Sequence, residues 1–132
     1  MERLESMVIF KKYTVDEVIF KRNENYDSAQ KTRIEFSIDK EVRRKDNQMI
    51  VNLITRVFEN CEEKNYPFEM TIEITGYFEI ENEGKDINFE PNAIAILYPY
   101  IRAIVSTYTA SANINPLILP AINVNALFNK KN

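Results

Sequence analysis

The chain has 132 residues, of which 45% are hydrophobic and 28% are charged, a composition typical of one globular domain. Seventeen basic and twenty acidic residues give a net charge of −3, which argues against a general nucleic-acid binder or a basic membrane anchor. With no His, one Cys (Cys61) and two glycines, the sequence excludes a Ser-His triad, a His/Cys zinc site, a disulfide framework and a phosphate-binding glycine loop. We therefore expect a single cytoplasmic binding domain over residues 1–132, without metal or cofactor, rather than an enzyme.

No segment has the composition of a targeting signal or a membrane span. Glu2 and Glu5 precede the first apolar run, which is atypical of a secretory signal. The most apolar stretch, residues 93–105, contains Pro99 and Arg102 and is shorter than the ~20 apolar residues of a transmembrane helix. We therefore expect no membrane insertion.

Four segments have the alternation or the composition of β-strands. They cover residues 6–20, 32–40, 48–60 and 68–81. The second places Ile34 on its inward face, and the fourth alternates strictly between apolar and polar side chains, as a half-buried antiparallel strand does. Gly76 falls on the apolar face of the fourth segment and indicates a bulge or a close approach of another backbone segment. The spacing of the segments predicts a four-stranded antiparallel meander.

Two connections between these segments are polar or charged. Residues 23–28 form a long polar loop after the first strand, and Arg43, Arg44 and Lys45 stand between the second and third strands. Three basic residues in a row could bind an anion, but their position favours a solvated hairpin tip.

The C-terminal third changes character and carries few charges. Asn92 is a suitable N-cap for a helix over residues 93–112, in which Pro99 predicts a kink or a later start. Arg102 is the one charged residue of this helix. Because an unpaired buried charge is costly, we expect it to pair with a carboxylate or a backbone carbonyl.

The predicted helix is apolar on nearly all sides, so it has to be buried nearly all round, although one sheet covers only one side. We therefore predict an oligomer that forms through this helix. The residues assigned to the interface are Ile94, Leu97, Tyr98, Ile101, Val105 and Tyr108. A second stripe contains Ile96, Tyr100, Ala103, Ile104 and Thr107. The alternative is a monomer in which the C-terminal residues fold over the helix.

The segment after the helix contains two prolines on either side of an apolar triplet. Pro116 and Pro120 flank residues 117–119, and Asn123 or Asn125 can cap a short final helix. Such a segment can line an apolar binding groove or pack into the core. The residues taken alone favour core packing.

Three blocks of the chain resemble the SecB family of protein-export chaperones. Residues 13–16 (Tyr-Thr-Val-Asp), with Ile and Phe shortly after them, resemble the first strand of the family. Residues 97–102 (Leu-Tyr-Pro-Tyr-Ile-Arg) resemble the opening of its long helix, and residues 116–128 resemble its proline-containing connection and final short helix. The order of the predicted elements agrees as well. The resemblance therefore implies a SecB-like α+β fold.

The same resemblance implies a function. SecB is an ATP-independent holdase that binds unfolded polypeptides or preproteins and assembles as a homotetrameric dimer of dimers. The client would be an exported preprotein or an aggregation-prone protein such as an antitoxin. The implied client-binding groove consists of Phe20, Tyr26, Leu117, Leu119, Ile122, Leu127 and Phe128.

The family also contacts the SecA motor, through an acidic sheet surface and an acidic C-terminus. The corresponding surface residues here are Asp16, Glu17, Glu69 and Glu73. Lys21 stands where a second acid is expected, and residues 129–132 are basic. These departures from the family pattern fit a SecB-like chaperone that works outside the main export route.

Two alternatives belong to other classes of protein. An adaptor or structural subunit would bind one dedicated folded partner through the same C-terminal surface. A small-molecule enzyme would have to use Tyr77, Glu79 and Cys61, which show no motif spacing. Cys61 is expected to be an inert packed thiol rather than a nucleophile.

Overall fold

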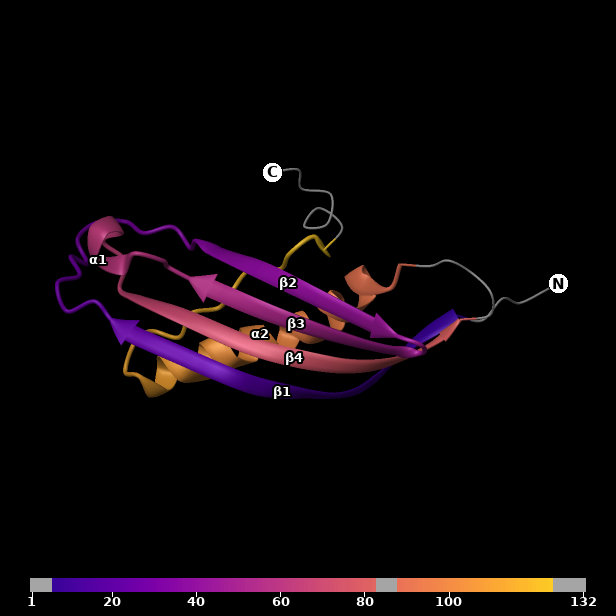
Figure 1. The fold of residues 1–132 in the computed structure, drawn as a ribbon. Coiled ribbons are helices and arrows are strands. Elements are labelled where there is room, and N and C mark those ends of the chain that lie inside the picture. The colour runs from indigo at the N-terminus through magenta and orange to yellow at the C-terminus, as the bar shows by residue number, and fades with distance from the viewer. Residues whose placement is uncertain (1–5, 83–87, 125–132) are drawn as a thin grey trace. The chain divides into compact units, whose positions relative to one another are not determined.

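The computed structural model describes residues 6–82 and 88–124 of the chain. Its elements are β1 (Ser6–Arg22), β2 (Phe36–Lys45), β3 (Gln48–Val57), α1 (Cys61–Lys64), β4 (Phe68–Asn82) and α2 (Glu90–Ser111) (Figure 1). The strands form one antiparallel sheet in the order β1-β4-β3-β2. This confirms the predicted α+β class, a four-stranded sheet followed by a long helix. The predicted final helix lies mainly outside the described residues.

The strand order differs from the predicted meander at β1. The strands β2, β3 and β4 are neighbours in sequence order, but β1 pairs with β4 rather than with β2. The chain therefore has to pass from one edge strand to the other, across three strand spacings of ~4.8 Å each. The long connection over residues 23–35 can do this, whereas a tight hairpin turn could not.

Two strand boundaries also differ from the prediction. β2 begins at Phe36 and runs on to Lys45, so Ile34, which was expected to face inward, lies before the strand and is exposed. β3 ends before Phe58, whose φ of 56° is in the left-handed region. A bulky residue with positive φ cannot continue an extended strand, which explains why the alternation stops there.

The chain divides into two compact units, named here after their main features. The helical unit consists of Met1–Tyr13, Val42–Val51 and Gly76–Asn132, and the loop unit of Thr14–Glu41 and Asn52–Thr75. Each strand contributes to both units, α2 belongs to the helical unit, and α1 belongs to the loop unit. Each unit has its own buried apolar side chains. The expected single domain over residues 1–132 stays a prediction.

In the loop unit, the buried side chain of Asn23 fixes the start of the polar loop. Its Nδ2 donates hydrogen bonds to the carbonyl oxygens of Cys61 and Tyr66, both at 3.0 Å, and its Oδ1 accepts one from the N–H of Asn25 at 3.0 Å. These bonds join the loop to the short helix α1, which the sequence did not predict. Because Asn23 is buried, the loop is anchored at its beginning.

In the helical unit, α2 begins earlier than predicted. The Oδ1 of Asn88 accepts a hydrogen bond from the N–H of Glu90 at 3.1 Å, and Pro91 occupies the first turn, where it leaves no hydrogen bond unmade. Asn92, the predicted N-cap, is therefore already inside the helix. The helix continues through Pro99, whose position is exposed, so that water can solvate the carbonyl group that the ring leaves without a partner.

The packing of α2 on β4 depends on a glycine. A Cβ atom at Gly76 would lie 2.7 and 2.8 Å from the two δ-methyl carbons of Leu97 and 2.9 Å from the ring of Phe78. Real Cβ atoms do not approach other carbons so closely, so this position has room for hydrogen only. The sequence predicted a bulge or a close backbone approach at Gly76, but the atoms that lie close to it belong to the side chains of Leu97 and Phe78.

The variant Gly76→Ala is expected to lower the free energy of unfolding by ~1–3 kcal/mol, because the added methyl group overpacks the contact with Leu97. Urea denaturation of the purified protein measures this loss. Leu97→Ala alone should also destabilise, but the double variant should lose less than the sum of the two single losses, since each change relieves the other. A Gly76→Ala protein as stable as the wild type would contradict this account of the contact.

Candidate functional site

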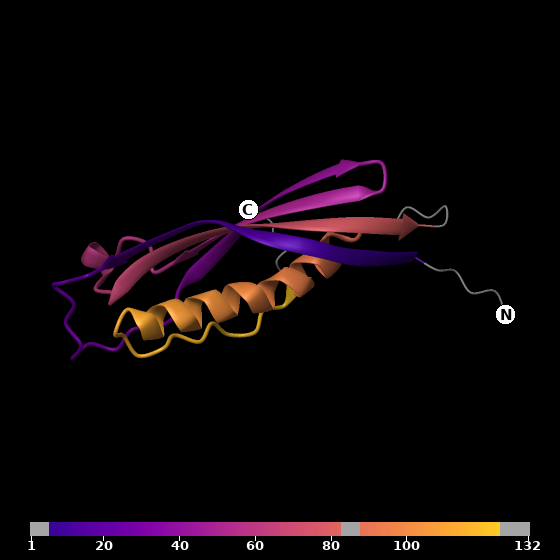
Figure 2. The ribbon, with the colours of Figure 1, turned by 90° about the horizontal axis from the view of Figure 1, so that it is seen from below.

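An extended tail, residues 114–122, follows α2 and runs back along it (Figure 2). Side chains on one side of the helix hold the backbone of this tail. Arg102 Nε donates a hydrogen bond to the carbonyl oxygen of Leu119 at 2.9 Å, and Ser106 Oγ donates one to that of Leu117 at 3.1 Å. Tyr98 donates its hydroxyl proton to the carbonyl oxygen of Pro120. Arg102 thus has one of the two kinds of partner expected from the sequence.

Thr109 also holds the tail, near the C-terminal end of the helix. We call the hydrogen bonds of Tyr98, Arg102, Ser106 and Thr109 to the tail backbone the tether. The hydroxyl of Thr109 donates to the carbonyl oxygen of Val105 at 2.8 Å and accepts a hydrogen bond from the N–H of Leu117 at 2.9 Å. The side chain is fully buried. Tyr98, Arg102, Ser106 and Thr109 are spaced three or four residues apart and therefore share one side of the helix.

The tether determines which tail side chains point outward. Leu119 is fully buried, whereas Ile118 is 63% exposed, the largest exposed fraction among the large hydrophobic side chains of the described residues. Leu117 and Ile122 are half-buried. The tail therefore presents an apolar strip centred on Ile118, a residue absent from the predicted groove. The alternation of an extended segment around the buried Leu119 could have identified it.

The remaining predicted groove residues lie elsewhere. Phe20 and Tyr26 are half-buried and belong to the loop unit, and Leu127 and Phe128 lie outside the described residues. Phe20 stacks on Phe68 with ring centroids 5.3 Å apart. The Phe58 ring contacts Phe68 edge-on at 5.2 Å, so Phe20 is the half-exposed end of an aromatic cluster in the loop unit.

The residues predicted to form an oligomer interface lie mostly inside the protomer. Buried within the single chain are Ile94, Leu97, Tyr98, Ile101 and Val105, and Tyr108 is 39% exposed. The first five are already removed from water, so of this set only Tyr108 is available to a second copy of the chain. The tail covers a further part of the helix, as in the monomeric alternative.

The second apolar stripe of α2 has a different environment. It borders a shallow cavity of about 320 Å³ lined by Tyr13, Tyr100, Ala103, Ile104, Thr107, Tyr108 and Ser111. The rings of Tyr13 and Tyr100 stack there with centroids 4.3 Å apart. This stripe therefore leaves an apolar, tyrosine-rich surface on the helical unit.

The acidic residues considered for SecA contact all belong to the loop unit. Asp16 accepts a hydrogen bond from the hydroxyl of Thr75. The Nδ2 of Asn52 donates to Glu73 Oε2 at 2.9 Å and to Thr75 Oγ1 at 3.1 Å, so four side chains form one network. Two of the acidic side chains thus have structural partners.

The other two acidic residues differ from each other. Glu17 is exposed, and Glu69 is half-buried, with its Oε1 accepting a hydrogen bond from the N–H of Cys61 at 3.3 Å. Lys21, where the resemblance led us to expect an acid, forms an ion pair with Glu62 at 3.4 Å. The charge of Lys21 is therefore partly compensated within the loop unit.

Sequence comparison identifies the family of the chain. The family described as "Preprotein translocase subunit SecB" matches residues 4–132. The chain therefore belongs to the SecB family, a family of chaperones. A curated relative, "Uncharacterized protein MJ0357" of Methanocaldococcus jannaschii, is 38% identical over 121 residues, which are 87% of this chain and 78% of the relative.

Two solved structures resemble the fold at low sequence identity. The SecB-like chaperone Rv1957 of Mycobacterium tuberculosis, solved with a ChAD peptide from the antitoxin HigA1, has a TM-score of 0.66 and 17% identity, covering 88% of this chain and 91% of its own. A Streptococcus agalactiae protein of unknown function has a TM-score of 0.53 and 13% identity, covering 89% and 99%. The first comparison supports the SecB-like fold, and the second shows a similar fold in a protein of unknown function.

Two of the residues that the enzyme alternative would require, Tyr77 and Glu79, contact lysine side chains. Glu79 forms an ion pair with Lys11 at 3.1 Å, and the ammonium group of Lys12 lies 5.0 Å from the ring centroid of Tyr77.

Within residues 6–82 and 88–124, no cluster of His, Cys, Asp and Glu could hold a metal ion. None of the described helices is both long and apolar enough to cross a membrane.

Cys61 is fully buried in the loop unit. Burial, and next its hydrogen bond with Glu69, raises the pKa of the Cys61 thiol to about 11. Nucleophilic cysteines have lowered rather than raised pKa values, since the thiolate is the reactive form. The thiol is therefore protonated at neutral pH, in agreement with its expected packing role.

The raised pKa of Cys61 predicts a pH dependence of stability. An unfolded thiol has a pKa of ~8.5, so the folded state holds this proton more tightly. Its contribution to stability is complete below pH ~8.5 and is lost as the pH rises through the folded pKa of about 11. Between pH 8 and pH 11, the wild type should lose about 1–3 kcal/mol of unfolding free energy relative to Cys61→Ala. Urea denaturation of both proteins across this range measures the difference, and parallel pH profiles would contradict the prediction.

Proposed function

We propose that this protein is an ATP-independent holdase that binds extended segments of non-native polypeptides, without catalysis and without a cofactor. Membership of the SecB family supports the chaperone class. The observation that carries the proposal is the exposed Ile118 on a tail that α2 holds by its backbone. The free, buried thiol of Cys61 is compatible with the reducing cytoplasm in which such a chaperone would act.

The tail suits the binding of extended chains because it presents apolar surface and has no charged residue of its own between residues 113 and 124. Burial of one large aliphatic side chain contributes ~1.5–3 kcal/mol before the cost of ordering the client. Ile118, Leu117 and Ile122 would form the contact in the helical unit. Phe20 and Tyr26 remain candidates in the loop unit, as do Leu127 and Phe128 in the C-terminal segment. Several weak contacts of this kind give useful affinity with little sequence specificity.

Clients of two kinds fit this surface. The structural resemblance to Rv1957, which was solved with an antitoxin peptide, favours an aggregation-prone client such as an antitoxin. Preprotein export is the second candidate and would use Asp16, Glu17, Glu69 and Glu73 to contact SecA. We favour the first, because Asp16 and Glu73 are engaged in the network with Asn52.

We also propose that the chain forms dimers, and from them a dimer of dimers, through the second stripe of α2. The interface would consist of Tyr100, Ala103, Ile104 and Thr107 of this stripe, together with Tyr108 and Ser111, which line the same cavity. This replaces the stripe chosen from the sequence, whose side chains are already buried within the protomer. The cavity between Tyr13 and α2 offers room for side chains of a second copy.

Dilution of an unrelated, chemically unfolded protein into this one, without nucleotide, tests the holdase proposal by light scattering. The wild type should suppress aggregation at about one oligomer per client. Ile118→Ser should raise the concentration needed for half-suppression about threefold or more, because it removes the main exposed apolar contact. Ile118→Met should retain the activity. Met7→Ser, which changes another exposed apolar side chain of the helical unit, should have little effect.

No suppression at several-fold excess of folded protein would contradict a general holdase. It would favour the adaptor alternative, in which the same surface binds a single dedicated partner. Loss of activity in Met7→Ser equal to that in Ile118→Ser would contradict the assignment of the tail.

The variant Ile104→Arg tests the proposed interface. It should lower the molar mass measured by size-exclusion chromatography with light scattering, because an unpaired buried charge opposes association by several kcal/mol. Ala95→Arg adds the same charge at an exposed position of α2 outside the stripe and should leave the mass unchanged. Equal masses for wild type and Ile104→Arg, with the fold intact by circular dichroism, would overturn the interface.

A further inference from the structure

The two units differ in charge although the chain as a whole is acidic. The helical unit contains ten basic and eight acidic residues, and the loop unit contains seven basic and twelve acidic residues. Much of the basic excess of the helical unit comes from its strands, at Lys11, Lys12, Arg43, Arg44 and Lys45. A locally basic surface on an acidic chain attracts anionic groups that the rest of the molecule repels.

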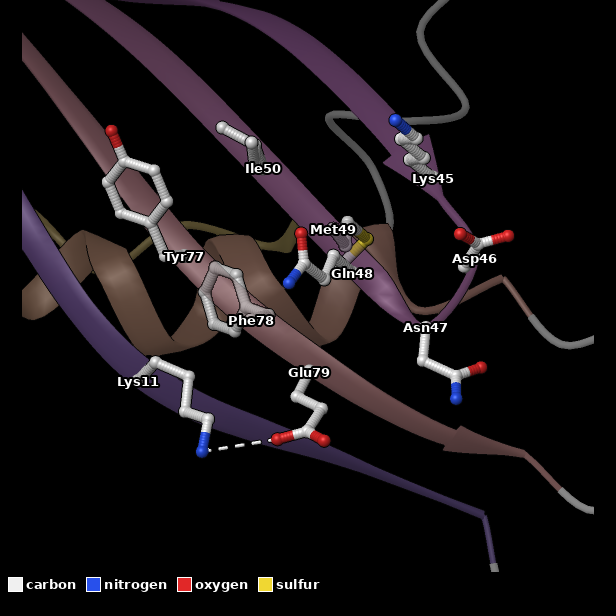
Figure 3. A pocket seen from close by; sticks show the side chains of 10 residues that line it. All are labelled: Lys11, Lys45, Asp46, Asn47, Gln48, Met49, Ile50, Tyr77, Phe78 and Glu79. Carbon is white, nitrogen blue, oxygen red and sulfur yellow. Dashed lines mark ion pairs between the residues drawn. The ribbon is translucent and has the colours of Figure 1, made fainter.

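Two of these basic residues, Lys11 and Lys45, border a cavity of about 510 Å³ on the strands of the helical unit (Figure 3). The cavity extends from Lys11 on β1, past Tyr77 and Glu79 on β4 and Ile50 on β3, to Lys45 at the end of β2. Tyr77 and Glu79 alternate with Gly76 and Phe78 along β4. Gly76 faces Leu97 of α2. The side chains of Tyr77 and Glu79 therefore point to the opposite face of the sheet, away from the helix.

A second cavity of about 220 Å³ adjoins the first. It shares Lys45, Gln48 and Ile50 with the larger cavity and is completed by Arg43 and Arg44. The two cavities therefore form one continuous surface around the β2–β3 hairpin, which we call the hairpin surface.

The charges of the hairpin surface are incompletely compensated. Glu79 is paired with Lys11 at 3.1 Å, and the turn contributes Asp46. By contrast, Arg43, Arg44 and Lys45 are exposed, and none of the three forms an ion pair with another residue in the described parts of the chain. Lys45 lies in the larger cavity with Ile50 and Tyr77, and Arg43 and Arg44 line the smaller cavity with Ile50, so positive charge adjoins apolar side chains in both.

We propose that the hairpin surface is a docking site for an extended acidic segment of a partner protein, one that alternates carboxylates with an apolar or aromatic side chain. The carboxylates would pair with Arg43, Arg44 and Lys45, and the apolar side chain would enter the larger cavity between Ile50 and Tyr77. This site is separate from the tail around Ile118 and goes beyond the proposed holdase function. It is also more than the solvated hairpin tip expected from the sequence.

Charge and shape favour a peptide over a nucleic acid. A nucleic acid carries a phosphate at every nucleotide and would bring that charge close to Glu79, to Asp46 and to a chain of net charge −3. An extended peptide has a side chain about every 3.3 Å on alternating sides, so its carboxylates can face the arginines while another side chain enters the cavity.

Fluorescence anisotropy tests the proposal with a short fluorescein-labelled peptide that alternates glutamate with phenylalanine. It should bind the full chain more tightly than peptides with lysine for glutamate or serine for phenylalanine. The double variant R43E/R44E should weaken binding of the glutamate peptide about tenfold or more. The matched control K31E/R33E makes the same charge change at exposed positions of the loop unit and should change the dissociation constant less than about twofold.

Further measurements complete the test. Raising the salt from about 0.1 M to about 1 M shortens the screening length from ~10 to ~3 Å and should weaken binding to the wild type. If R43E/R44E does not fold by circular dichroism, R43Q/R44Q replaces it with the same expected direction. Ile118→Ser should leave the affinity unchanged even if it abolishes holdase activity, which separates this site from the tail.

Three results would overturn the proposal. The first is unchanged affinity in both arginine variants, and the second is loss of peptide binding in Ile118→Ser, which would place the peptide on the tail. The third is tighter binding of a single-stranded oligothymidylate than of the acidic peptide at the same salt concentration, which would make the surface a nucleic-acid site.

Discussion

The burial of α2 is the constraint on which the rest of the helical unit depends. Between residues 91 and 111 the helix has one charged side chain, and its apolar side chains occupy most of its circumference. No single covering layer removes such a helix from water. β4 covers one side, where Gly76 admits Leu97, and the tail covers a second. A third side carries the tyrosine-rich surface around Tyr100, which is the interface proposed above.

The polar side chains of α2 also contribute to its burial, because they bind the tail that covers it. Arg102 is the one charged residue between residues 91 and 129, so no carboxylate is close to it in sequence. It pairs with a carbonyl oxygen of the tail, and Ser106 and Thr109 bind the same backbone. Each bond satisfies a polar group of the tail that would otherwise lose its contact with water. The side chains of the helix and the backbone of the tail thus satisfy each other's hydrogen-bonding groups.

The sequence predicts those features that depend on local pattern. Strict alternation identified β4, and the same alternation placed Gly76 where α2 approaches. Alternation determines which face a side chain occupies but not which strand lies beside it, so the pairing of β1 with β4 was missed. The same limit applies to the site. The triplet around Ile118 was recognisable, but hydrogen bonds to a helix eight or more residues earlier decide that Leu119 turns inward. The two stripes of α2 are similarly apolar, and only the packed structure shows which one meets the sheet.

The tether between α2 and the tail recognises carbonyl and N–H groups, which every residue carries, rather than particular side chains. Outward-facing positions of the tail can therefore change identity over evolutionary time while the hydrogen bonds that hold it persist. The hydrogen bonds that attach the tail are therefore independent of the side chains that the tail exposes. Related chains could then acquire different repertoires of bound polypeptides by drift at a few positions such as Ile118, with the helix and its polar side chains retained unaltered.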